Sequence, residues 1–270
     1  MQNTQPIIKD LVLLGGGHSH VIVLRRFGMR PMPGVRITLV TRDLHAPYSG
    51  MLPGVIAGHY SFDDAHIDLA PLCRFAGARL YHTEAVGLDL SKKAVVCRGR
   101  PPVPYDLLSV DIGIAPNCGI LGASEHAVPV KPIAGLVSRW KALEKRIRVS
   151  SDPLRVAVVG AGAAGVELTL SMHRAVMKVG KTISPPEFHL FGSAPTVMPT
   201  HSRGAQRRFT RVLSERGVYL HLGQRVSQVS NDRIELDDGT AHPVDEIVWA
   251  TDAAPQRWLG DSGLAVDDHG

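Results

Sequence analysis

Residues 156–165 read VAVVGAGAAG, and this stretch decides the fold that we expect of the chain. Its apolar residues predict a buried strand, and its glycines complete the pattern G-x-G-x-x-G, which turns a strand tightly into a helix. Gly160 permits the sharp bend, Gly162 lets a pyrophosphate approach the backbone, and Gly165 allows close packing of helix on strand. Free amides and the helix dipole favour a phosphate where Ala163-Ala164 begins the helix. The sequence therefore predicts a dinucleotide-binding turn; a glycine-rich helix start that holds no ligand is the alternative.

A second turn of this kind is expected at residues 11–20, which read LVLLGGGHSH. Gly15-Gly16-Gly17 forms the turn and His18-Ser19 begins the helix, but His20 occupies the position of the third glycine. Its side chain should push the helix slightly away from the strand or tilt it. The two histidines would diverge on a helix and have no carboxylate nearby in the sequence, so packing is preferred over a metal site. Two turns in one chain predict two dinucleotides, with electron transfer between them.

The two halves of the chain continue in the same order after their turns. Each half is expected to run through a helix, a strand, a helix that ends at a glycine, a third strand and several short strands. We therefore predict an α/β fold of two Rossmann-like βαβ dinucleotide-binding domains, each with a small antiparallel β-meander. The predicted helices span residues 18–27, 67–75, 134–148, 163–179 and 205–216, and the predicted parallel strands span 11–14, 35–40, 78–82, 155–159, 187–191 and 218–221.

The composition is that of a soluble globular protein, with 270 residues of which 44% are hydrophobic and 20% charged. No apolar run reaches the ~18 residues that cross a bilayer, and the N-terminus lacks a signal-peptide layout. Cys73, Cys97 and Cys118 form no C-x-x-C pair, so neither a zinc site nor a local redox disulfide is predicted, and we expect a thiol-reducing cytoplasm.

The net charge of +5 is spread along the chain apart from a local group of arginines. A solvated surface is the preferred interpretation of this group, with a nucleotide phosphate or an anionic surface as the alternative; nucleic-acid binding is not predicted. The group consists of Arg203, Arg207, Arg208 and Arg211.

Specificity for NADH or NADPH depends on the end of the second strand, where an acidic residue usually binds the ribose hydroxyls. The first half has Thr41-Arg42-Asp43 there, and Asp43 lies slightly beyond the usual position of the acid. Thr41 and Arg42 are candidate cofactor contacts. The second half offers Phe191-Gly192-Ser193, which has no acid. Since Arg203 lies downstream, the sequence leaves both nicotinamide cofactors open.

Several short segments are distinctive in combination. They are residues 15–20 (GGGHSH), 47–54 (PYSGMLPG), 126–132 (HAVPVKP), 160–167 (GAGAAGVE) and 249–251 (WAT). With these segments the chain resembles the FAD-dependent pyridine nucleotide-disulfide oxidoreductase superfamily. Within it, the chain resembles the branch often fused to selenide, water dikinase, which is similar to type II NADH dehydrogenases.

The resemblance implies that the first turn binds FAD and the second binds NAD(P)H. Residues 1–130 would be the first part of the FAD-binding domain, residues 131–252 the NAD(P)-binding domain, and residues 253–270 the incomplete start of a return to the FAD domain. Members of the superfamily carry a late Gly-Asp motif that holds the FAD ribitol. Gly260-Asp261 lacks its flanking strand and helix, so we expect a chain truncated at its C-terminus.

The resemblance also implies site residues. Tyr48, Ser49, Gly50, Met51, Leu52 and Pro53, in the loop 47–54, would lie beside the isoalloxazine ring, with an ordinary surface turn as the alternative. Lys131 would contact a cofactor. Glu167 would lie where nicotinamide meets flavin and act in catalysis, with a solvated acid favoured by the helix dipole as the alternative. The cysteine pair of the disulfide-reducing members is missing from the sequence, so dithiol reduction is not expected.

The expected function is that of an FAD-dependent NAD(P)H oxidoreductase. A hydride would pass from nicotinamide to flavin, and the electrons would pass to a quinone or another small-molecule acceptor. A non-catalytic NAD(P)-binding fragment without a complete flavin site is the alternative. The sequence leaves a homodimer and a peripheral membrane contact open, and it does not identify the acceptor.

Overall fold

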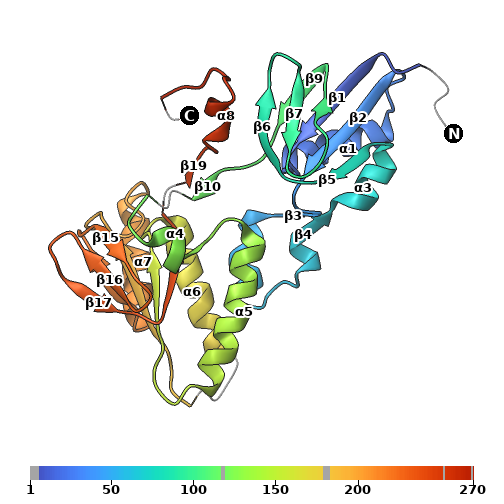
Figure 1. Cartoon of the computed structure of the whole chain (residues 1–270). Helices are drawn as coiled ribbons and strands as arrows, with labels where there is room; N and C mark the ends of the chain where they lie inside the picture. Colours follow the sequence, from blue (N-terminus) through green and yellow to red (C-terminus); the bar gives the residue numbers. More distant parts are fainter. Residues whose placement is uncertain (1–5, 117–118, 179–182, 252, 269) are drawn as a thin grey trace. The chain divides into compact units, whose positions relative to one another are not determined.

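A computed structural model describes residues 6–116, 119–178, 183–251, 253–268 and 270 (Figure 1). Its contacts divide the chain into two units. Unit 1 comprises residues 1–48, 62–114 and 254–270, and unit 2 comprises residues 49–61 and 115–253. This division differs from the expected boundary after residue 130, because side chains before that point are buried in the cores of unit 2. They include Leu52, Ile56 and Ala123.

Unit 1 is built on a four-stranded sheet in the order β5-β2-β1-β9, with every neighbouring pair parallel. Alternate side chains of the strands serve two different cores, as the period of a strand requires. Leu13 and Leu39 pack with the helices α1 and α3, whereas Leu14 and Val40 pack with the small antiparallel sheet β6-β7-β8. The elements are β1 (Lys9–Leu14), α1 (His18–Met29), β2 (Val35–Thr41), α3 (Leu69–Ala76), β5 (Arg79–His82), β6 (Ala85–Asp89), β7 (Ala94–Cys97), β8 (Val103–Pro104) and β9 (Leu107–Val110).

The last segment of unit 1 closes over its small sheet. Trp258, in the short helix α8 (Trp258–Asp261), and Leu264 pack against the core formed with β6 and β7. Ser262 accepts a hydrogen bond at 3.0 Å from the backbone N–H of Leu88. Unit 1 is therefore assembled from three separate stretches of chain. Its remaining elements are β3 (His45–Pro47), η2 (Asp63–Ala65) and β4 (His66–Asp68), and β10 (Ala115–Pro116) and β19 (Ala253–Ala254) fall where the chain passes between the units.

Unit 2 repeats this plan with a five-stranded parallel sheet in the order β11-β18-β12-β13-β14. Helices α2, α5, α6 and α7 contribute to the core on one face, and the antiparallel sheet β15-β16-β17 with α4 contributes to the core on the other (Figure 1). The elements are η1 (Ser49–Met51), α2 (Leu52–Ile56), α4 (Ala123–His126), β11 (Val128–Pro129), α5 (Ile133–Val149), β12 (Arg155–Val159), α6 (Ala163–Lys178), β13 (Glu187–Gly192), α7 (Arg203–Glu215), β14 (Tyr219–Leu222), β15 (Val226–Val229), β16 (Arg233–Leu236), β17 (Ala241–Pro243) and β18 (Glu246–Trp249).

The predicted repeat is confirmed, and the differences lie at helix ends. The helix expected from residue 67 begins at Leu69, because Ile67 pairs with Ala46 in an antiparallel strand and Asp68 caps the helix. The Asp68 carboxylate accepts from the N–H of Ala70 at 2.9 Å, which is how an N-cap residue ends the extended backbone before a helix.

Three histidines meet where the parallel sheet of unit 2 faces its meander. Nδ1 of His189 lies 3.1 Å from Nε2 of His221, and the His221 ring stacks on Phe191 with centroids 4.3 Å apart. The His242 ring lies 4.3 Å from that of His221. Burial, reinforced by the charges of the neighbouring histidines, lowers the pKa of His221 to about 4, and burial also lowers the pKa of His189.

We expect acid to destabilise unit 2 through these histidines. The fold favours the neutral forms of these histidines. Their contribution to the free energy of unfolding is therefore complete above the unfolded pKa of 6.5, and it is lost as the pH falls toward 4. For His221 the loss between pH 7.5 and 4.5 should be about 2 kcal/mol after allowance for partial exposure. Urea unfolding, followed by tryptophan fluorescence in a W258F background that keeps only the tryptophans of unit 2, measures it.

His221→Phe should reduce this pH dependence, whereas His201→Gln, at an exposed position, should leave it unchanged. Equal pH dependence in the wild type and in H221F would contradict the assignment.

Candidate functional site

The second glycine turn leads directly from β12 into α6. Gly160 has φ +118° and donates its N–H to the carbonyl of Phe191 at 2.8 Å. A Cβ at Gly160 would collide with the carbonyl of Ala250, and a Cβ at Gly165 would collide with the carbonyl of Gly160. Only glycine fits at these two positions, so the close approach of helix and strand that the pattern predicts is present.

The start of α6 is open in this turn. No described heavy atom outside the immediate chain neighbours lies within 4 Å of a Cβ built at Gly162, which is exposed. Val166 is the donor to the Gly162 carbonyl, at 3.0 Å, so the amides of Ala163, Ala164 and Gly165 precede the hydrogen-bonded turn of the helix. A pyrophosphate fits this place, since donors and free space coincide there.

The first glycine turn has the same backbone path between β1 and α1. Gly15 has φ +96° and donates to the carbonyl of Val40 at 2.8 Å. His20, in the place of the third glycine, is 1% exposed. Its Nδ1 lies 2.7 Å from the carbonyl oxygen of Gly15 and its Nε2 lies 2.9 Å from Oγ of Ser109. This geometry is that of a packed side chain that joins the helix to the turn and to β9.

A residue that the sequence reasoning missed lies at the start of α1. Oδ2 of Asp111 accepts hydrogen bonds from the backbone N–H groups of Ser19 at 3.0 Å and His20 at 3.3 Å. Its carbonyl also accepts from the N–H of Gly17 at 3.2 Å. Asp111 directly follows β9, and an alignment of the two halves on their last strands could have drawn attention to it.

The other residues predicted for the first dinucleotide lie at the end of β2. Oγ1 of Thr41 would lie 3.2 Å from a Cβ at Gly16, which places Thr41 beside the turn. Arg42 forms an ion pair with Asp43 at 3.0 Å. His18 is exposed, and its ring centroid lies 5.2 Å from that of Tyr48.

Comparison with known proteins identifies the family to which this architecture belongs. A family model described as pyridine nucleotide-disulphide oxidoreductase matches residues 9–270. The chain belongs to this family. The expected superfamily is therefore confirmed.

Two relatives of known name share less than a quarter of their aligned residues with this chain. The NADH dehydrogenase-like protein YutJ of Bacillus subtilis is 23% identical over 269 residues, which cover 97% of this chain and 70% of YutJ. The sulfide-quinone reductase of Aquifex aeolicus is 22% identical over 244 residues, which cover 87% of this chain and 56% of the reductase.

Solved structures share the fold. NDH2 from Plasmodium falciparum, in complex with NADH, matches with a TM-score of 0.82 at 17% identity, over 94% of this chain and 57% of NDH2. The sulfide:quinone oxidoreductase of Aquifex aeolicus matches with a TM-score of 0.72 at 19% identity, over 94% of this chain and 61% of that one. The predicted fold class is confirmed, and this chain spans little more than half of either structure.

The remaining predicted site residues lie in unit 2. Ser49, Gly50 and Met51 form η1, and Pro53 lies in the first turn of α2, while the Leu52 side chain is buried in the core of unit 2. Lys131 follows β11, at the same carboxyl edge of the sheet as the second glycine turn. Glu167 is exposed on α6, and none of the described residues forms an ion pair with it.

The cysteines of this family member are buried where the structure describes them. Cys73 and Cys97 are free, and burial raises the pKa of the Cys73 thiol to about 11. A thiol of this kind stays protonated and unreactive at neutral pH. Cys118 lies outside the described residues. In the described part of the chain, no group of three or more His, Cys, Asp or Glu side chains has an arrangement suited to a metal ion, and no helix is long and apolar enough to cross a membrane.

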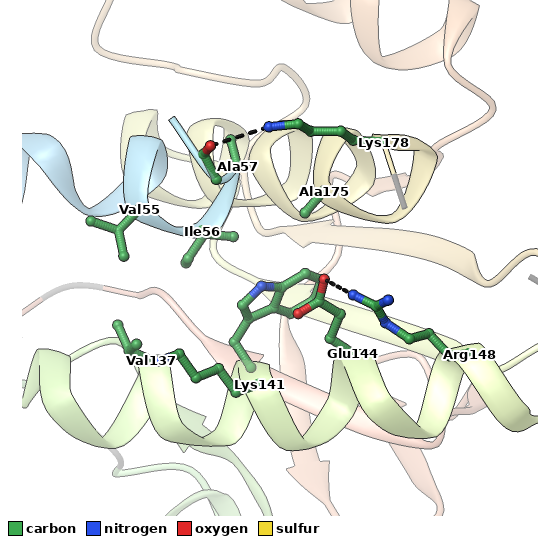
Figure 2. Close-up of a pocket in the computed structure, with 11 residues that line it drawn as sticks. Val55, Ile56, Ala57, Val137, Lys141, Glu144, Arg148, Ala175 and Lys178 are labelled. Atoms are coloured by element: carbon green, nitrogen blue, oxygen red, sulfur yellow. Dashed lines mark hydrogen bonds and ion pairs between the residues drawn. The ribbon is translucent and has the colours of Figure 1, made fainter. Parts of the chain in front are cut away.

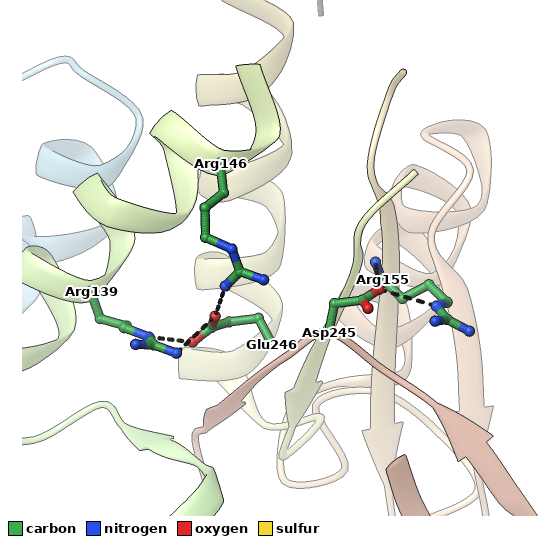
Figure 3. A network of polar contacts seen from close by, with 5 residues as sticks. All are labelled: Arg139, Arg146, Arg155, Asp245 and Glu246. Atoms are coloured by element: carbon green, nitrogen blue, oxygen red, sulfur yellow. Dashed lines mark hydrogen bonds and ion pairs between the residues drawn. The ribbon is translucent and has the colours of Figure 1, made fainter. Parts of the chain in front are cut away.

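A polar network in unit 2 lies at the sheet edge opposite the glycine turn. Glu246 begins β18 and is 4% exposed, and its carboxylate accepts from Arg139 at 2.6 Å and from Arg146 at 2.8 Å, both on α5 (Figure 3). Asp245 accepts from the N–H of Arg155 at 2.8 Å and from its guanidinium at 3.1 Å. Ligands of parallel α/β sheets bind at the carboxyl ends of the strands, so this network holds α5 in place.

A groove of about 410 Å³ in unit 2 lies between the end of α2, most of the length of α5 and the last turns of α6 (Figure 2). Its lining residue Ala175 is twelve residues beyond the start of α6, or roughly 18 Å along a helix. This groove is therefore separate from the dinucleotide turn. It is lined by Val55, Ile56, Ala57, Gly58, Val137, Trp140, Lys141, Glu144, Arg148, Ala175 and Lys178.

Proposed function

We propose that this protein is an FAD-dependent NAD(P)H oxidoreductase, with FAD at the first glycine turn and NAD(P)H at the second. The observation that carries the proposal is the repeat itself, in which each parallel sheet has a glycine turn and a helix start at its carboxyl edge. Membership of the pyridine nucleotide-disulphide oxidoreductase family supports it. FAD, when bound, would supply the two-electron redox chemistry of hydride transfer.

The second turn would hold the NAD(P)H pyrophosphate through the amides of Ala163, Ala164 and Gly165. Gly192 and Ser193 end β13 where an acid would bind the adenosine ribose. Since neither carries a carboxylate, the protein has no acid at that point to exclude a 2′-phosphate. Lys131 and Glu167 would act near the nicotinamide, and residues 48–53 near the flavin.

The electron acceptor we propose is a quinone or another small molecule. The name of one relative is sulfide-quinone reductase, and that of another is external alternative NAD(P)H-ubiquinone oxidoreductase B4 of Arabidopsis thaliana. The matched region covers 56% of the first relative and 47% of the second. The acceptor of the whole protein is therefore part of what we propose. We also propose that the protein lies in the cytoplasm and forms a homodimer.

A second candidate function is NAD(P) binding without flavin chemistry. The observation that favours it is the Asp111 carboxylate bonded to the first helix start, where FAD would place its phosphates. In the part of the chain that the structure describes, the second turn has no such obstacle.

An anaerobic visible spectrum distinguishes the two candidates. We expect the purified chain to take up added FAD, give a protein-bound flavin band, and lose that band when NADH or NADPH is added. Comparison of the two nicotinamides at equal concentration gives the preference. A spectrum of free flavin that neither nicotinamide bleaches would favour the second candidate.

A further inference from the structure

The two glycine turns differ in what occupies their helix starts. At the first turn, a Cβ at Gly17 would collide with the carboxylate of Asp111, which is bonded to the N–H groups of Ser19 and His20. At the second turn, none of the described residues places an atom within 4 Å of a Cβ built at the equivalent Gly162. Gly17, the N-cap residue of α1, has no side chain, so a residue from the end of β9 supplies the cap.

The chain itself identifies the counterpart of Asp111. A Cβ at Gly15 would meet the carbonyl of Asp111, and a Cβ at Gly160 would meet the carbonyl of Ala250. Asp111 follows the strand that pairs with β1, and Ala250 follows the strand that pairs with β12. The same backbone position therefore carries a carboxylate in the first turn and a methyl group in the second.

We infer that Asp111 is a displaceable cap that competes with the FAD pyrophosphate for the amides of α1. This inference rests on the proposed function, in which the first turn holds FAD. The amides of Ser19 and His20 have one hydrogen each, so the carboxylate and a phosphate oxygen cannot both be bound in full. The two groups also carry the same charge, so the carboxylate must turn away before the phosphate takes its place.

Competition of this kind has a signature that structural damage lacks. Removal of the carboxylate should destabilise the protein without FAD, because two amides lose their acceptor. The same change should strengthen FAD binding, by about tenfold for a cap of ordinary strength. Removal of a residue that only supported the turn would lower both the stability without FAD and the affinity for FAD.

The test compares FAD affinity and thermal stability in flavin-free protein, with flavin fluorescence as the readout. Asp111→Ala and Asp111→Asn are the test variants, and Asn keeps the shape while removing the charge. Asp106→Ala is the matched control, since Asp106 accepts from the N–H of Asp10 at 2.7 Å at the opposite edge of the same sheet. We expect lower stability in the absence of FAD for D111A and D106A, and tighter FAD binding for D111A and D111N alone.

A reciprocal variant tests the same idea in unit 2. Ala250→Asp introduces a carboxylate at the counterpart position, and we expect it to weaken NADH binding about tenfold, by the same cap argument. If the wild type binds FAD and D111A and D111N bind it equally well or more weakly, the proposed competition by Asp111 is wrong. The proposed function is unaffected by that result. Failure of the wild type and of D111A alike to bind FAD would overturn both.

Discussion

Gly162→Val is expected to remove NAD(P)H binding while unit 2 stays folded. The Cβ of residue 162 enters open space at an exposed position, so the substitution disturbs no packed neighbour among the residues that the structure describes. The two methyl groups of valine would cover the place where the pyrophosphate meets the amides of Ala163 and Ala164. Hydrogen bonds to a charged group contribute about 1.5–3 kcal/mol each, so loss of two should weaken binding by about 100-fold or more.

Titration of NADH fluorescence measures this affinity, and circular dichroism checks that the variant is folded. Gly135→Val is the matched control, because Gly135 lies in the first turn of α5, is exposed, and also has open space around a built Cβ. Wild-type NADH affinity in G162V would remove the second turn from the proposed site. A comparable loss in G135V would point to general damage to the domain.

Glu246→Ala is expected to destabilise unit 2 by about 3 kcal/mol. The carboxylate is buried at the start of β18 and holds two arginines of α5, so its removal leaves both guanidinium groups without their anion. The loss should stay at the lower end of the range for a broken buried ion pair. The reason is that the Arg139 and Arg146 side chains are 54% and 48% exposed and can turn toward water.

Urea unfolding followed by fluorescence of Trp140 and Trp249 in the W258F background reports on this unit. Glu144→Ala provides the control, since Glu144 pairs with Arg148 at 3.0 Å on the same helix, where both side chains line the groove and stay partly open to solvent, and should contribute less than about 1 kcal/mol. Similar shifts in the two variants would show that the buried pair contributes no more to stability than a partly exposed pair. NADH affinity in E246A that follows the fraction of folded protein would agree with a structural role.

The repeat could be predicted because its signals are local. A strand, a glycine turn and a helix follow one another within about ten residues. Gly15 and Gly160 have a positive φ, which favours glycine, and Gly165 lies against the carbonyl of Gly160, five residues earlier. The continuous apolar runs of β1 and β12, whose last residues are all buried, likewise lie within single strands. The fold class, and the position of both turns within it, follow from these features.

The missed features depend on contacts between distant parts of the chain. Asp111 is 92 residues from Ser19, and its side chain has no local signal that it caps a helix. The packing of residues 49–61 into unit 2 has the same cause, because Leu52 and Ile56 find their apolar neighbours on α5 and α6. The helix start at Leu69 was missed because the strand before it pairs with residues 45–47.

The three-part construction of unit 1 has a consequence for how the protein is made. Trp258 and Leu264 pack against its core, yet the ribosome adds them only after residues 115–253 have been synthesised. At roughly 5–20 residues per second, that stretch takes on the order of ten seconds to synthesise. Unit 2 therefore has its whole chain before unit 1 does, and during this interval the nascent small sheet of unit 1 is without the segment that covers it.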